Sequence, residues 1–112
     1  MNLAIVQGEL TSAPRERTLA SGDTLISYEI RSVDADDSKL TVPVSWVSPS
    51  RPPAVDIGDE VVAVGVVRRR FFRAGGATQS RTEIAASLVA RPGSKRVDRA
   101  IERALEPVAK AV

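Results

Sequence analysis

Residues 58–72 read Gly-Asp-Glu-Val-Val-Ala-Val-Gly-Val-Val-Arg-Arg-Arg-Phe-Phe, and this stretch decides the fold. It begins with a Gly-Asp turn signal, continues through β-branched valines and ends in a basic and aromatic run, so it predicts a long β-strand. Its first two thirds are apolar on both faces, and a strand of this kind is covered on both sides. Gly65 in the middle predicts a bend or bulge, as a small curved barrel requires.

The basic end of this strand is the candidate binding surface. Successive strand side chains point to opposite faces, so Arg68, Arg70 and Phe72 share one side. Their spacing of roughly 6.5 to 7 Å is close to the phosphate repeat of a single nucleic-acid strand. We therefore expect a nucleic-acid contact here; the plainer alternative is a solvated strand end with an aromatic side chain packed on it. Four further arginines near this hairpin or in an early loop are added as candidate contacts: Arg15, Arg17, Arg73 and Arg81.

The valines on the outward face of this strand must also be covered, which favours contact with another layer or another subunit. A later amphipathic helix offers a second apolar stripe. The candidate interface residues on the strand and on this helix are Val62, Val64, Val66, Val97, Ile101 and Leu105.

Composition excludes several kinds of site. The 112 residues include no cysteine and no histidine, which removes disulfides, thiolate zinc sites and Ser-His or Cys-His pairs. We therefore expect no enzyme activity, no cofactor and no metal. The net charge of +2 is too small to indicate a polyanion partner by itself, although thirteen of the sixteen basic residues are arginine, which suits phosphate contacts. No apolar run is long enough to span a membrane and no basic region precedes the first apolar run, so a soluble, cytoplasmic protein is expected.

The remaining strands are short runs between turn signals. Together with residues 58–72 they predict a small antiparallel barrel with Greek-key connections and a helix that Ser94 caps and Pro107 kinks or ends. The other predicted strands are residues 3–10, broken or bent at Gly8 and with an extension at 15–19, and residues 24–33, 39–47 and 80–89. We place the barrel domain at residues 1–92 and a helical tail at 93–112.

Two strands carry the predicted core. Alternation places Ile26, Tyr28 and Ile30 inward and Leu25 outward. In the next strand, Trp46 shares a face with Leu40, Val42 and Val44, which makes it a core residue by pattern. A bulge at Pro43 would instead turn Trp46 outward as a platform for bases, and both alternatives remain open.

Two stretches of this sequence resemble the bacterial single-stranded DNA-binding proteins that have an oligonucleotide-binding (OB) barrel. Residues 8–22 follow that family's pattern Gly-x-Leu-Thr-x-x-Pro-x-x-Arg-x-x-x-Ser-Gly without a gap, and residues 58–72 with 81–83 match its long hairpin. The resemblance implies an all-β, five-stranded OB-fold barrel. Phe72 matches the family's aromatic at the end of the fourth strand, Arg68 and Arg70 match the basic positions before it, and Trp46 falls near the aromatic that ends the third strand.

The resemblance further implies sequence-tolerant binding of single-stranded DNA by a homo-oligomer, a dimer or tetramer, in DNA replication, repair or recombination. Three departures favour an alternative, an OB-fold interaction module that has lost most DNA binding. The loop that holds Asp34, Asp36 and Asp37 is short and acidic, and a proline-rich segment stands where the family has a helix. In place of the family's acidic C-terminal tip, the sequence ends in the amphipathic helix, so the resemblance is to a short form.

Overall fold

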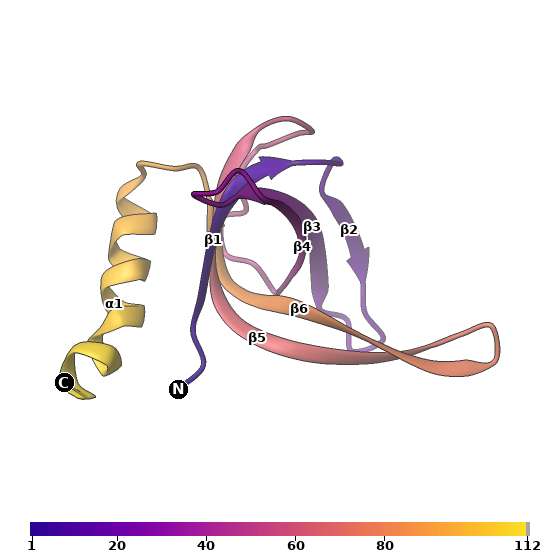
Figure 1. Cartoon of the computed structure of the whole chain (residues 1–112). Helices are drawn as coiled ribbons and strands as arrows, with labels where there is room; N and C mark the ends of the chain where they lie inside the picture. Colours follow the sequence, from indigo (N-terminus) through magenta and orange to yellow (C-terminus); the bar gives the residue numbers. More distant parts are fainter. Residues whose placement is uncertain (112) are drawn as a thin grey trace.

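Six β-strands and one helix follow one another along residues 1–111, the part of the chain that the computed structural model describes (Figure 1). They are β1 (Ala4–Leu10), β2 (Arg15–Thr18), β3 (Thr24–Val33), β4 (Lys39–Val47), β5 (Glu60–Ala74), β6 (Ala77–Ala90) and α1 (Lys95–Ala111). The five predicted strands are all present. The first is divided into β1 and β2 because the Ser12–Pro14 turn interrupts it, and the last residue of the predicted tail lies outside the described residues.

The strands close into a barrel of the predicted topology. β1 pairs with β5, β5 with β6, β6 with β4 and β4 with β3, and β3 returns to β1 at Glu9 and Leu10. All of these pairs are antiparallel except β4 with β6. β2 pairs with the edge of β3 that faces away from β4, and it is the last strand of the sheet on that side. The all-β OB-type barrel with a C-terminal helix is therefore confirmed.

Inward-facing side chains from all sides of the barrel form one core. The predicted inward residues Ile26, Tyr28 and Ile30 are buried in it, and so is Val61 at the start of β5. Burial raises the pKa of the Tyr28 phenol to about 12, with a smaller contribution from the negative charge of Glu16.

Trp46 also belongs to this core. It is 4% exposed and lies opposite Ile26 across the β3–β4 pair. The alternative in which Trp46 stacks on bases is therefore wrong, because the alternation of β4 is regular in this part of the strand and turns the indole inward.

Two other predictions about the core are wrong. Leu25, expected to face solvent, is buried outside the main core, next to its strand partners Arg17 and Val47. Leu40, expected in the core, is 63% exposed. It lies in the first part of β4, before this strand meets β6 at Val44, so no barrel wall covers it.

The outward valines are covered by the chain itself. α1 packs on the outer face of β5 and β6, where its Val97 joins Val62 and Val64 in the buried cluster (Figure 1). Ile101 is partly buried against the same cluster. The prediction that Val62, Val64 and Val97 form a subunit interface is wrong, because the packing of α1 on the barrel already buries them. The predicted role of Ile101 stays a prediction. Val66 and Leu105, at 41% and 42% exposure, are the members of the predicted interface that stay accessible.

The helix begins as predicted and, of the two effects predicted for Pro107, an end at this residue is wrong. The Ser94 Oγ accepts a hydrogen bond of 3.2 Å from the Val97 N–H, which confirms the N-cap. Pro107 does not end the helix, which continues to Ala111. The missing N–H removes one hydrogen bond, the one to the carbonyl four residues earlier, and the helix continues for about one more turn. In residues 1–111, no helix has the length and apolar character needed to cross a membrane.

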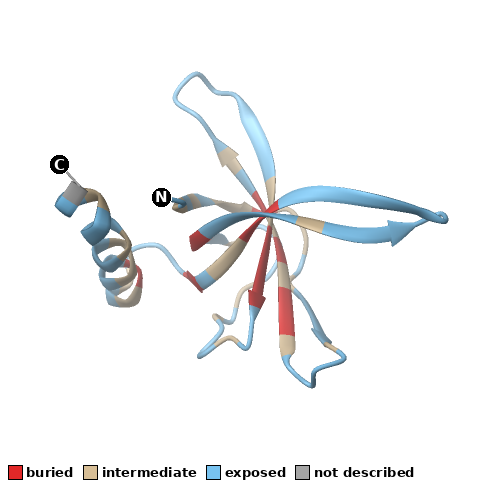
Figure 2. Cartoon of the chain, turned by 90° about the horizontal axis from the view of Figure 1, so that it is seen from below, coloured by how far each residue is buried: buried red, intermediate tan, exposed pale blue. Residues whose placement is uncertain are grey.

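β5 and β6 continue beyond the barrel as an exposed hairpin (Figure 2). Gly65 marks the predicted irregularity: the pairing shifts by one residue between Val64 and Gly65, and a Cβ on Gly65 would collide with the backbone carbonyl of Ala85. At the tip, Gly75 and Gly76 have φ of 59° and 79°, as a two-residue type I′ turn requires.

Candidate nucleic-acid interface

A hollow of about 660 Å³ lies on the outer face of the barrel wall, between β2 and β3 on one side and the β5–β6 hairpin on the other. We call it the basic hollow. It is lined by Ser12, Ala13, Arg15, Glu16, Arg17, Ser27, Glu29, Arg70, Phe72 and Arg81. Residues from four strands and one turn therefore meet at a place that no single stretch of sequence defines.

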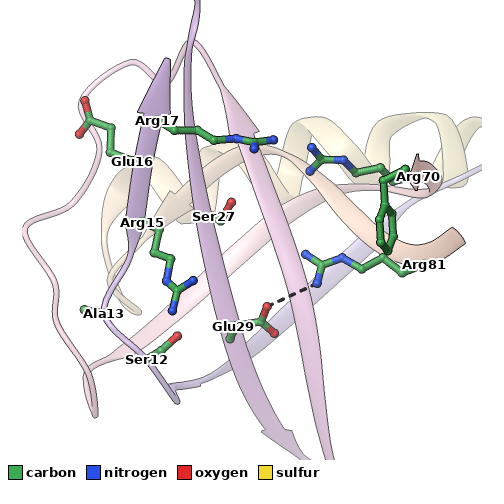
Figure 3. A pocket seen from close by; sticks show the side chains of 10 residues that line it. Ser12, Ala13, Arg15, Glu16, Arg17, Ser27, Glu29, Arg70 and Arg81 are labelled. Carbon is green, nitrogen blue, oxygen red and sulfur yellow. Dashed lines mark ion pairs between the residues drawn. The ribbon is translucent and has the colours of Figure 1, made fainter. Parts of the chain in front are cut away.

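Strand pairing explains why arginines converge there. Arg15 and Arg17 are two residues apart in β2, so their side chains leave the same face of the strand. Arg15 lies opposite Ser27, whose side chain faces outward from β3. Across the hollow, Arg70 of β5 pairs directly with Arg81 of β6, so both side chains leave the same face of the hairpin. In Figure 3, Arg17 and Arg70 extend toward each other from opposite sides.

Positive charge predominates in the basic hollow, with four arginines against two glutamates. Arg81 Nη1 lies 3.9 Å from Glu29 Oε1, a partly exposed ion pair that contributes little by itself. Among the described residues, no carboxylate comes within 4.0 Å of the other three arginines, Arg15, Arg17 and Arg70. Glu16 points away from this group in Figure 3. Three guanidinium groups are therefore available to an anionic ligand.

An aromatic side chain stands beside these charges. Phe72 lines the basic hollow and is 39% exposed, while its neighbour Phe71 is 67% exposed and belongs to the opposite face of the strand. A ring that is held against a groove but open on one face can stack on a nucleic-acid base.

Five of the eight predicted contact residues therefore come together in one hollow, and three do not. Trp46 is in the core. Arg68 faces the same side as Arg70, but its Nη2 lies 3.4 Å from Oε1 of Glu83, whose side chain is only 1% exposed. Arg73 does not line the hollow; near the hairpin tip, its Nη2 donates to the Gly76 carbonyl at 3.3 Å.

The acidic turn that argued against binding is not part of the basic hollow. Its Asp36 is exposed, and hydrogen bonds from Ser38 lower the pKa of this carboxyl. Sequence reasoning missed Glu29, the partner of Arg81, because the contact depends on how β3 lies relative to the hairpin. Among residues 1–111, no cluster of three or more acidic side chains is placed to hold a metal ion.

No protein-family model matches this sequence, and no curated protein does. Solved structures do resemble its fold. One is the wild-type single-stranded DNA-binding protein from Thermus aquaticus, with a TM-score of 0.63 and 17% identity; the match covers 84% of this chain but only 41% of that one. Another is the dimeric N-terminal domain of the PriB protein from Thermoanaerobacter tencongensis, with a TM-score of 0.62 and 12% identity over 80% of this chain and 93% of that one.

These likenesses define the class: the chain has an OB-fold barrel of the type found in bacterial single-stranded DNA-binding proteins. The fold that the two sequence motifs implied is thereby confirmed. At these identities the comparisons bear on the fold alone. The match spans less than half of the Thermus aquaticus chain.

Proposed function

We propose that this protein binds single-stranded DNA through the basic hollow, with little preference for sequence. The observation that carries the proposal is the convergence of Arg15 and Arg17 of β2 with Arg70, Phe72 and Arg81 of the hairpin. The outer face of this part of an OB barrel, bordered by its long loops, is a surface suited to oligonucleotides. The two solved structures of similar fold include a single-stranded DNA-binding protein, in agreement with this proposal.

The chemistry divides into two parts. The guanidinium groups of the four arginines that line the hollow neutralise successive phosphates, with Arg81 exchanging its weak pair with Glu29 for a phosphate, and this part of the binding energy decreases with salt. Phe72 stacks on a base, which every base permits because each has a flat aromatic face. Neither contact reads a base edge, and for this reason the binding tolerates different sequences.

The alternative function, an interaction module without DNA binding, has less support. A module of that kind would have no need for a half-exposed phenylalanine among arginines that lack carboxylate partners. The lack of any histidine or cysteine supports a binding protein over an enzyme. We place its action in the cytoplasm, in DNA replication, repair or recombination, where duplex opening exposes single strands.

We further propose that several copies act together on one strand. One aromatic platform contributes only about 1–3 kcal/mol per base, so a single subunit binds weakly unless copies share a strand. An available assembly surface is the edge of β1: it pairs with β5 along Ala4–Glu9, but with β3 only at Glu9 and Leu10. The exposed Ile5 lies on this strand. Light scattering coupled to gel filtration measures whether the protein is a monomer, a dimer or a tetramer.

Fluorescence anisotropy with labelled oligo-dT tests the proposed function. We expect saturable binding at micromolar protein and low salt, competition by unlabelled single strands of mixed sequence, and much weaker competition by duplex DNA. A parallel titration with oligo-rU compares RNA with DNA. Failure to saturate at micromolar protein, or equal competition by duplex DNA, would contradict the proposal.

A further inference from the structure

A second basic surface lies away from the basic hollow, between α1 and the part of the sheet formed by β5 and β6. Here a groove of about 410 Å³ runs along the helix. Arg96, Arg99 and Arg103 line one side, and Val64 and Leu88 are among the apolar residues beneath them. We call this the helix groove. It shares no lining residue with the basic hollow, and Figure 1 shows α1 and the hairpin tip on opposite sides of the barrel.

The three arginines of the helix groove are not equivalent. Arg96 is held in place, because its Nη1 and Nη2 donate to the carbonyls of Arg51 and Ser50, each at 2.9 Å. Within residues 1–111, neither Arg99 nor Arg103 has a carboxylate oxygen within 4.0 Å. Both side chains are exposed. Two guanidinium groups beside a fixed third one are thus free to bind carboxylates or phosphates.

The residues at the bottom of the helix groove indicate which of the two anions, a peptide carboxylate or a nucleic-acid phosphate, it suits. This floor is made of aliphatic side chains, with Ala100 and Ala104 of the helix facing Leu88 of the sheet, and no aromatic residue lines it. Binding of single strands relies on aromatic platforms for the bases. An aliphatic floor beside guanidinium groups instead complements a polypeptide segment that carries both apolar side chains and carboxylates.

We propose that the helix groove is a docking site for an acidic, apolar segment of a partner protein. Arg96 and Arg103 are seven residues apart, about 10 Å along the helix, which corresponds to about three residues of an extended strand. The segment places aliphatic side chains against Ala100 and Ala104, the partly exposed apolar residues of the groove, and directs its carboxylates to Arg99 and Arg103. The interaction therefore couples the protein to a second macromolecule while the basic hollow stays free for DNA.

A labelled hexapeptide of alternating leucine and aspartate is the probe, with a serine–aspartate hexapeptide of equal charge as its control. We expect the leucine-containing peptide to bind the full chain and the serine-containing peptide to bind at least about tenfold more weakly. Equal binding of the two peptides would show an attraction of charges only and overturn the proposal. Failure of the first peptide to bind at up to about 1 mM would also overturn it.

Three variants locate the site. Arg99→Glu with Arg103→Glu reverses the two free charges, and Ser87→Trp fills the groove without changing any arginine; each lowers peptide affinity by at least about tenfold. Lys95→Glu with Lys110→Glu makes the same charge change outside the groove and leaves peptide affinity within about twofold. Thermal unfolding of each variant confirms that it folds. Unchanged binding to Ser87→Trp would contradict the proposal.

Oligo-dT binding separates this site from the basic hollow. We expect Arg99→Glu with Arg103→Glu to bind oligo-dT no more weakly than the lysine control does. If oligo-dT affinity instead falls as far as peptide affinity, the helix groove belongs to the nucleic-acid surface and the assignment to a protein partner is wrong. If wild type binds the peptide but not oligo-dT, the docking site stands and the proposed DNA binding fails.

Discussion

Replacing Arg70 with alanine should reduce the salt dependence of DNA binding, because this side chain is one of the four arginines that line the basic hollow. If each arginine neutralises one phosphate of a single strand, the slope of log K against log[salt] is about −0.7 per arginine, or about −2.8 in all. Raising salt from about 50 to about 200 mM then weakens wild-type binding about 50-fold. With three arginines the slope becomes about −2.1 and the same salt step costs about 20-fold.

Arg69→Ala is the matched control. This neighbouring arginine is exposed, but it belongs to the opposite face of β5 and does not line the hollow. Anisotropy titrations with labelled oligo-dT at several salt concentrations measure the slope for wild type and both variants. We expect Arg69→Ala to keep the wild-type slope and Arg70→Ala to lose about 0.7 of it. Equal slopes for the two variants would refute the assignment of the binding face, whatever the number of subunits on one strand.

Three other predictions follow from the same structure. Phe72→Ala should weaken oligo-dT binding by about 1–3 kcal/mol, some five- to 150-fold, while Phe71→Ala on the opposite face should not; equal losses would rule out stacking on Phe72. Because Trp46 is buried, its emission should change little at saturation with oligo-dT, and Trp46→Ala should lower the free energy of unfolding by about 3–5 kcal/mol in urea; strong quenching would place the indole at the DNA. The pKa of Tyr28 rises from 10.0 to about 12 on folding, so the unfolded chain ionises first above pH 10 and stability is lost as pH increases. Ionisation of this phenol in the unfolded chain should by itself lower the free energy of unfolding by about 1.4 kcal/mol at pH 11. Tyr28→Phe should therefore lose less stability than wild type between pH 9 and pH 11.

Local sequence patterns were sufficient for the elements of this fold. The valine-rich strand and the Ser94 cap each depend on interactions within a few residues, and each occurs where the pattern placed it. The alternation of β3 likewise identified Tyr28 and its neighbours as core residues. Periodicity reports which side of a strand is apolar, and this was enough to predict a barrel.

Periodicity could not predict which element packs on the outer face of β5. An apolar outer face must be buried, but the pattern does not say whether a helix of the same chain or a second subunit covers it. The structure decides in favour of α1, whose Val97 meets Val62 and Val64. The oligomer contacts predicted from these valines were wrong for this reason.

The register of the hairpin explains why the candidate site was only partly predicted. The extra residue in β6 near Ser87 shifts the pairing, so that Arg70 faces Arg81 and Arg68 faces Glu83. Without this bulge Arg70 would face Thr82, and Arg68 would face Ile84. One inserted residue therefore brings a second arginine of the hairpin to the hollow and gives Arg68 a buried carboxylate partner. A single sequence does not specify this register.

Amide chemical-shift mapping during titration with oligo-dT tests the central claim most directly, because it reports every backbone position at once. We predict that the largest changes fall on β2, on Ser27 and Glu29 of β3, and on the hairpin around Arg70, Phe72 and Arg81, with α1 little affected. Changes centred on α1 or on the face that carries Arg69 and Phe71, or no changes at saturating oligo-dT, would contradict the account.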